Sequence, residues 1–162
     1  MNVQPPLPEA AQRVANHLQA LGHDQPVTLL PATGRTSAEA AAALGCQIAE
    51  IAKSIVLRRL ADDAAVMVIA SGANRVDEIK VATRLGPVGK ADARFVKERT
   101  GYSIGGVCPV GHPQPLLMLI DTDLLQYTHI WAAAGHPHAV FRLTPQQLLA
   151  MTGGLATDVA LR

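Results

Sequence analysis

The sequence predicts one mixed α/β domain in which helices flank a mixed or largely antiparallel sheet. The length of 162 residues suits a single domain, and no stretch resembles a linker between two cores, so we expect one domain over residues 1–162. Hydrophobic residues make up 49% and charged residues 17%, a balance that excludes intrinsic disorder. Apolar segments of strand length come partly as a hairpin and partly between helical patterns, which is typical of a mixed sheet.

Five segments carry helical patterns that are bounded by start and stop signals. Val14 and Leu18 recur at helical spacing in the first of them. The second begins with a capping-box sequence, in which the Thr36 hydroxyl accepts from the amide three residues on. In the last, Pro145 follows the cap residue Thr144 at the first helical position. The expected helices are 9–21, 36–45, 76–85, 92–99 and 144–153, with single helical turns near 48–51 and 123–126.

Short apolar runs between turn residues predict the strands. Two of these runs are separated by the polar stretch Ala61-Asp62-Asp63, which favours a hairpin. The expected strands are 27–30, 54–60, 64–70, 116–120, 130–133 and 139–143, with a closing strand at Val159.

The least regular stretch runs from Gly101 to Pro115 and holds four glycines and three prolines. Long irregular loops inside compact domains are usually functional or disordered. A strongly apolar strand follows this loop at once, so we expect the loop to be held against the core.

Composition and charge exclude several classes of function. The chain has 14 Lys and Arg against 13 Asp and Glu, which argues against non-specific coating of nucleic acid. Residues 53–99 hold ten basic and six acidic side chains, and this local excess either receives one phosphate-bearing ligand or solvates helix faces. Only five residues are aromatic, too few for a base-stacking platform. Neither a membrane span nor a signal peptide is recognisable, and two cysteines make no disulfide framework, so we expect a cytoplasmic protein.

The motifs of several enzyme classes are missing from the sequence. It contains no P-loop, no dinucleotide-binding glycine motif after a strand, no His-Glu-x-x-His and no Gly-x-Ser-x-Gly. A nucleoside triphosphatase, a dinucleotide oxidoreductase, a zincin and an α/β-hydrolase are therefore disfavoured.

Two features suggest chemistry, and each has a plainer interpretation. Lys53 leads into an apolar strand, where it either guards a solvated edge or binds an anion. Gly105 and Gly106 open a loop that ends at Pro109, and consecutive amides in such a loop can bind an anion or a developing oxyanion. The same residues also suit an ordinary tight turn. Within the loop we expect Cys108 to be packed and not to act as a nucleophile.

Three histidines form the remaining candidate. His112, His136 and His138 could bind zinc with Cys108 as a fourth ligand. However, His112 and His136 each lie in a Gly-His-Pro turn, where an exposed polar residue is ordinary. We expect no metal, and His136 alone as a substrate-binding or proton-handling residue is the better interpretation.

Together these pieces resemble the YbaK/EbsC family, the single-domain relatives of the editing insertion in bacterial prolyl-tRNA synthetase. The resemblance covers about residues 10–155. It is carried by short motifs in a fixed order, and no single motif is specific. The motifs are Thr36-Ser37-Ala38-Glu39, Ile51-Ala52-Lys53-Ser54, Val68-Ile69-Ala70-Ser71-Gly72, Arg75-Val76-Asp77, Gly101 to Pro109, Trp131 to His136, and Leu143-Thr144-Pro145.

The resemblance implies a curved, barrel-like mixed sheet and hydrolysis of the ester between a wrong small amino acid and the 3′ end of tRNA, without metal or cofactor. The amino acid would be Ala, Cys, Ser, Thr or similar, most often on tRNA for proline, with prolyl-tRNA synthetase as a possible partner. The family lysine matches Lys53, its glycine loop matches Gly105 and Gly106, and its late histidine matches His136. Substrate contacts are expected from Thr36, Ser71, Gly72, Val107, Pro109 and Gly135.

Two other functions stay open on the sequence alone. One is an acceptor-end binding module that has lost catalysis, which the same fold permits. The other is a histidine-based metal hydrolase. Neither the choice between His136 and the substrate ribose hydroxyl as proton carrier nor the oligomeric state follows from the sequence.

Overall fold

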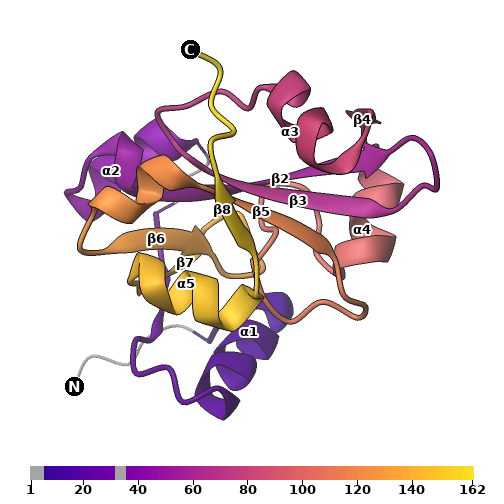
Figure 1. The fold of residues 1–162 in the computed structure, drawn as a ribbon. Helices are drawn as coiled ribbons and strands as arrows, with labels where there is room; N and C mark the ends of the chain where they lie inside the picture. Colours follow the sequence, from indigo (N-terminus) through magenta and orange to yellow (C-terminus); the bar gives the residue numbers. More distant parts are fainter. Residues whose placement is uncertain (1–5, 32–35) are drawn as a thin grey trace, which may run out of the picture.

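The computed structural model describes residues 6–31 and 36–162, and in them helices pack on both faces of one sheet (Figure 1). The helices are α1 (Glu9–Ala20), α2 (Ser37–Leu44), α3 (Glu78–Leu85), α4 (Ala93–Thr100) and α5 (Pro145–Thr152), with short 3-10 helices η1 (Ile48–Glu50) and η2 (Thr122–Gln126). The strands are β1 (Val27–Leu29), β2 (Ile51–Arg59), β3 (Ala65–Ser71), β4 (Val88–Lys90), β5 (Leu117–Asp121), β6 (Ile130–Ala133), β7 (Ala139–Leu143) and β8 (Leu155–Thr157). None of these helices is long and apolar enough to cross a membrane.

The eight strands form one mixed sheet, as the sequence predicts. Its order is β1-β7-β6-β2-β3-β5-β8, and β4 pairs with β2 beside this path. Neighbours in the hairpins β2–β3 and β6–β7 are antiparallel, whereas β2–β6, β3–β5 and β5–β8 are parallel. Among the described residues, the end strands β1 and β8 do not pair with each other, so the sheet is open and not a closed barrel.

The core has a large part on one face of the sheet and a smaller part on the other. On the larger side, Val14 and Leu18 of α1 pack with Phe141 of β7, and Val107 and Cys108 join the same cluster. On the other side, α3 packs against β2, β3 and β5 through Val81, Val66, Val68, Leu57 and Leu119. The irregular 101–115 loop is thus held against the core, as expected from the strand that follows it.

The local signals that predict helix ends are confirmed. The Thr36 hydroxyl accepts from the Glu39 amide at 3.1 Å, and Thr144 and Gln147 form a complete capping box at α5. Strands β6 and β7 have the predicted bounds.

Three expectations about strands need correction. Strand β2 begins at Ile51 and not at residue 54, because its first two residues pair with β6. Strand β4 was not expected, since only its pairing with β2 makes this three-residue segment a strand. The last strand is Leu155–Thr157 rather than at Val159, which is buried in the cluster under α3.

Candidate active site

Strand β2 has a gap in its pairing along one edge. Its other edge pairs with β3 from Ala52 to Arg58 without interruption. On the gapped edge, Ile51 and Ala52 pair with β6, and residues 57–59 pair with β4. Residues 53–56 therefore have no strand partner there among the described residues. A cavity of about 270 Å³ has residues 51–55 of β2 in its wall.

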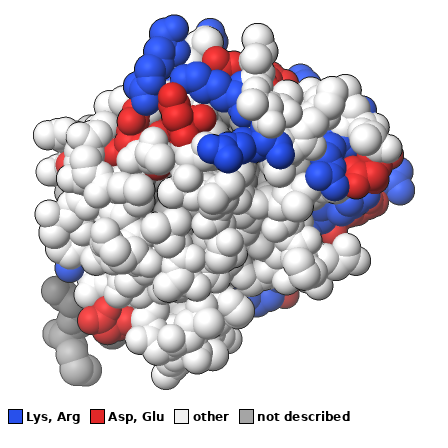
Figure 2. All heavy atoms as spheres, in the orientation of Figure 1, with Lys and Arg blue, Asp and Glu red and all other residues white. Residues whose placement is uncertain are grey.

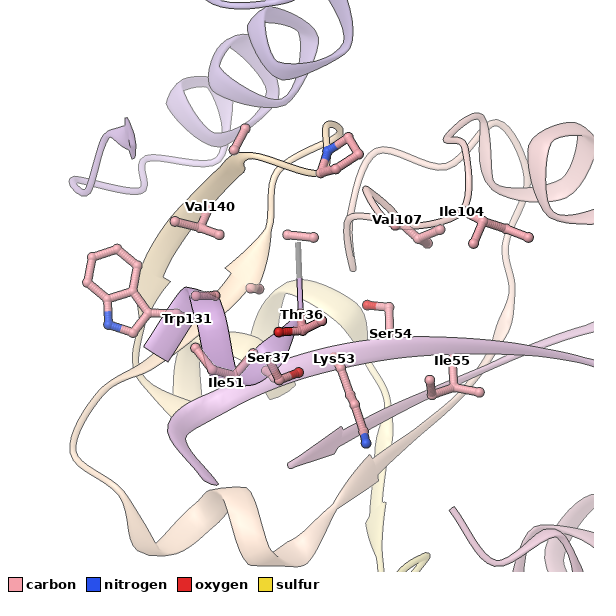
Figure 3. A pocket seen from close by; sticks show the side chains of 17 residues that line it. Thr36, Ser37, Ile51, Lys53, Ser54, Ile55, Ile104, Val107, Trp131 and Val140 are labelled. Atoms are coloured by element: carbon pink, nitrogen blue, oxygen red, sulfur yellow. The ribbon is translucent and has the colours of Figure 1, made fainter. Parts of the chain in front are cut away.

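Four parts of the chain close this cavity (Figure 3). Thr36 and Ser37 contribute the start of α2, and residues 51–55 contribute one wall. Ile104, Gly105 and Val107 come from the irregular loop, and the β6–β7 hairpin supplies the opposite side from Trp131 to Val140. The lining is mostly apolar with a few polar groups, a composition typical of a small-molecule site. The fold thus brings Thr36, Lys53, Gly105 and Val107 to one cavity.

Lys53 lies at the border between two pockets. Its side chain leaves β2 on the side opposite to Ser54, whose side chain is on the Val107 side (Figure 3). There Lys53 lines a second pocket of about 240 Å³ with Arg75 and Glu78. Burial lowers the pKa of the Lys53 ammonium, Asp121 opposes this shift, and Arg75 adds to it. No carboxylate in residues 6–31 and 36–162 forms an ion pair with Lys53.

The glycine loop is built for close approach to the β6–β7 turn. Gly105 has φ +95°, which favours glycine, and a Cβ there would lie 3.6 Å from Pro137. A Cβ on Gly106 would lie only 2.7 Å from the His136 nitrogen and 2.8 Å from its Cα. The Gly106 amide donates to the Ser103 carbonyl at 3.0 Å, so it is occupied inside the loop. The Val107 amide has no hydrogen-bond acceptor within the described residues, and Val107 lines the cavity.

The backbone of Gly135 and His136, in the β6–β7 turn, lies against Gly106 of this loop. Gly135 has φ +89°, and a Cβ on it would lie 2.7 Å from the Ala10 carbonyl of α1. The Nδ1 atom of His136 accepts from the His138 amide at 3.1 Å, so neutral His136 carries its proton on Nε2. His136 contacts Gly106 through its main chain but does not line the cavity, whereas Pro137 does.

The remaining predicted contact residues lie outside the cavity lining. The Ser71 hydroxyl donates to the Ala49 carbonyl at 2.7 Å, and its amide donates to Asp121 at 3.0 Å. A Cβ on Gly72 would collide with the Ile48 carbonyl, so both residues hold η1 against β3. Pro109 lines a different pocket beside His17 and His112.

Neither the cysteine nor the histidines form a reactive cluster. Cys108 has no exposed surface, and burial raises the pKa of its thiol to about 12, so it stays protonated. The Nε2 atom of His112 forms a hydrogen bond of 2.7 Å with the Cys108 carbonyl, and burial lowers the pKa of the His112 ring. Over residues 6–31 and 36–162, no group of three or more His, Cys, Asp or Glu side chains is placed to hold a metal ion.

Two serines of the cavity wall, Ser37 and Ser54, were not predicted as site residues from the sequence. Ser54 lines the cavity, and its Oγ is buried without a hydrogen-bond partner among the described residues. The available signal was strand alternation, because a residue next to Lys53 must face the other side of the sheet.

The surface charge is uneven (Figure 2). Charged side chains of both signs gather in that view above and to the right, around α3 and the β2–β3 hairpin, while the face over β6 and α5 is largely uncharged. Arg58, Arg59 and Lys80 form ion pairs with Asp63, Asp62 and Asp158 in this charged region.

Comparison with known proteins identifies the family of this chain. A family model described as an aminoacyl-tRNA editing domain matches residues 32–151. The chain belongs to the aminoacyl-tRNA editing domain family. This editing domain is 42% identical, with a TM-score of 0.92, to a structure described as a candidate trans-editing enzyme for prolyl-tRNA synthetase, and the match covers 97% of this chain and 100% of that one.

Two further proteins are similar to this editing domain. The hypothetical protein APE2540 is 31% identical, with a TM-score of 0.84 over 92% of this chain and 99% of that one. The uncharacterized protein YwhH of Bacillus subtilis (strain 168) is 28% identical over 136 residues, which are 83% of this chain and 86% of that protein. The likeness extends over most of each chain, so the editing domain accounts for most of this fold.

Proposed function

We propose that this editing domain is a trans-acting deacylase that hydrolyses the ester between a small, wrongly attached amino acid and tRNA. The observation that carries the proposal is the small cavity beside the gap in β2, with Lys53 at its border and the glycine loop in its wall. An ester of this kind is already activated, so the site has to position a water and stabilise the oxyanion. It requires neither a cofactor nor a protein nucleophile.

The proposed reaction adds water to the ester carbonyl. The water oxygen bonds to the carbonyl carbon, the negative charge moves to the carbonyl oxygen, and the bond to the ribose oxygen then breaks. That ribose oxygen takes up a proton, and the amino acid leaves as a carboxylate. The Val107 amide is the donor we assign to the oxyanion, since the Gly106 amide is already bonded to Ser103. The water's proton passes to the neighbouring ribose hydroxyl, because His136 lies outside the cavity lining and its Nδ1 atom already accepts from the His138 amide.

Lys53 is the residue we assign to a phosphate of the terminal adenosine. It is a half-buried cation with no ion-pair partner among the described residues, and it borders the cavity. Thr36, at the start of α2, and Gly105 complete the proposed contacts, while Ser71, Gly72, Pro109 and Gly135 act through the backbone they support.

The proposed substrates are small amino acids such as Ala, Cys, Ser or Thr on tRNA for proline. A cavity of about 270 Å³ accommodates an aminoacyl group of this size. A synthetase separates side chains that differ by one methylene by only ~1–3 kcal/mol, so a second, smaller site has a clear use. Prolyl-tRNA synthetase is the partner we expect, and the cytoplasm the location, because both follow from this substrate.

A deacylation assay separates this proposal from its alternatives. The enzyme should release the amino acid from at least one mischarged tRNA faster than the ester hydrolyses spontaneously. Tight binding of tRNA without release would instead identify an acceptor-end binding module. Loss of the activity on removal of bound metal from purified protein would revive the histidine-based metal hydrolase.

A further inference from the structure

The centre of β2 turns unpaired main-chain groups toward the gap in its pairing. In an antiparallel pair, the main-chain groups of successive residues point alternately toward the partner and away from it. The Gly72 amide donates to the Ile51 carbonyl at 2.7 Å, and the Arg59 amide donates to the Ala64 carbonyl at 2.9 Å. Odd-numbered residues of β2 therefore bond toward β3. Ser54 lies between them and directs its amide and carbonyl toward the gapped edge.

Ser54 finds no partner at that edge. Ala52, Val56 and Arg58 point the same way. Ala52 meets β6 and Arg58 meets β4, whereas Val56, like Ser54, has no strand partner on this edge among the described residues. In residues 6–31 and 36–162, β6 pairs with β2 only as far as Ala52 and β4 pairs with it only from Leu57, so no strand pairs with Ser54 on this edge. Its Oγ is also buried and unpartnered, although the residue lines the cavity. Unpaired polar groups in such a place are rare and costly in native proteins, which points to a ligand that satisfies them.

We propose that the carbonyl oxygen and the Oγ of Ser54 bind the α-ammonium group of the aminoacyl ester. This inference rests on the proposed deacylase function and adds a recognition element to the same site. An ammonium group carries three N–H donors and no acceptor, whereas a carbonyl and a hydroxyl oxygen both accept. The neighbouring Lys53 side chain lies on the opposite side of β2, so the strand separates its positive charge from that of the ligand (Figure 3).

The proposed contact fixes the orientation of the aminoacyl group. With its nitrogen at Ser54, the group lies along the β2 edge, as a residue of an added strand would. Val107, on the Ser54 side of β2, then provides both an amide for the ester carbonyl and an apolar wall. The site consequently selects a free α-amino group and rejects tRNA whose amino acid is blocked by an acyl group or a peptide.

The test compares alanyl- and seryl-tRNA for proline with their N-acetyl derivatives, each rate being divided by that of spontaneous hydrolysis. Acetylation removes the positive charge and two of the donors, so we expect kcat/KM of the wild-type protein to fall about 10- to 100-fold. Ser54→Ala should lower kcat/KM about tenfold on the free-amine substrates and leave the N-acetyl rates unchanged. Thr83→Ala, which also removes one hydroxyl but from the exposed face of α3, is the matched control and should change neither.

Three results would overturn the inference. Equal acceleration of free and N-acetyl substrates by the wild-type protein would show that the ammonium is not recognised. An equal loss on both substrates in Ser54→Ala, at an unchanged melting temperature, would make Ser54 a general structural residue. In both cases the deacylase function stands. Failure of the wild-type protein to hydrolyse any free-amine substrate would overturn the deacylase function, and this inference with it.

Discussion

Replacement of Gly106 by alanine tests whether the glycine loop holds the reacting ester in register. Gly106 does not have a positive φ, so alanine meets no backbone strain there. Its Cβ would lie 2.7 Å from the His136 nitrogen and 2.9 Å from the Gly135 carbonyl carbon, both of which are backbone atoms. Restoring an ordinary contact moves the loop, and the Val107 amide with it, by about 0.7 Å. A displacement of this size should slow the chemical step about 10- to 100-fold.

The assay is single-turnover deacylation, with tRNA affinity measured separately. Gly89→Ala is the matched control, because Gly89 also lacks a positive φ, lies outside the cavity lining, and its Cβ would meet only the flexible Leu60 side chain at 3.0 Å. Gly105→Ala should slow deacylation less than Gly106→Ala does, since its Cβ meets only Pro137 at 3.6 Å. The remaining cost is the backbone strain of alanine at a positive φ, ~1–2 kcal/mol. Wild-type chemistry in Gly106→Ala would refute the role of the loop, and a loss confined to tRNA binding would reduce that role to placing the acceptor end.

Three further outcomes follow from Lys53 and the thiols. Lys53→Ala should weaken deacylation about tenfold or more while the melting temperature barely moves, and near-wild-type activity would remove Lys53 from the site. Because burial lowers the pKa of the Lys53 ammonium, this group loses its proton at a lower pH than an ordinary lysine, and tRNA affinity should fall with it as the pH rises. Lys53→Ala should abolish this pH dependence of tRNA affinity. An unchanged pH profile in the variant would contradict the assignment. A thiol reagent should modify Cys46 but not Cys108 in the native protein and both after unfolding, and rapid modification of Cys108 in the native state would revive a covalent mechanism.

The sequence predicted those parts of the fold that depend on local chemistry. Helix caps such as Thr36 and Thr144 bond groups within three residues, so the pattern alone locates them. The start of β2 and the whole of β4 depend on pairing with distant strands, and no local pattern marks such pairing. Val159 looks like a strand residue because it is apolar, but it is buried under α3, and its carbonyl accepts from the Asp77 amide at 2.7 Å outside any named strand.

The sequence predicted part of the candidate site. The fold brings Lys53 and Gly105 to one cavity with Thr36 and Val107. The other six predicted residues lie outside its lining: Ser71, Gly72, Gly106, Pro109, Gly135 and His136. The sequence could not show that the Gly106 amide is used within its own loop or that His136 lies outside the cavity lining, since both follow from the turn geometry. The gap that exposes Ser54 arises only when β6 and β4 stop short on the same edge of β2.

We propose above all that this editing domain removes a small, wrongly attached amino acid from tRNA. The most direct measurement is the rate of amino acid release from alanyl-, seryl-, cysteinyl- and threonyl-tRNA for proline, beside prolyl-tRNA as the correct product. We expect release of at least one of the four well above the spontaneous rate, and prolyl-tRNA to persist as it does without enzyme. Release of none of the four, by folded protein that still binds tRNA, would contradict the claim.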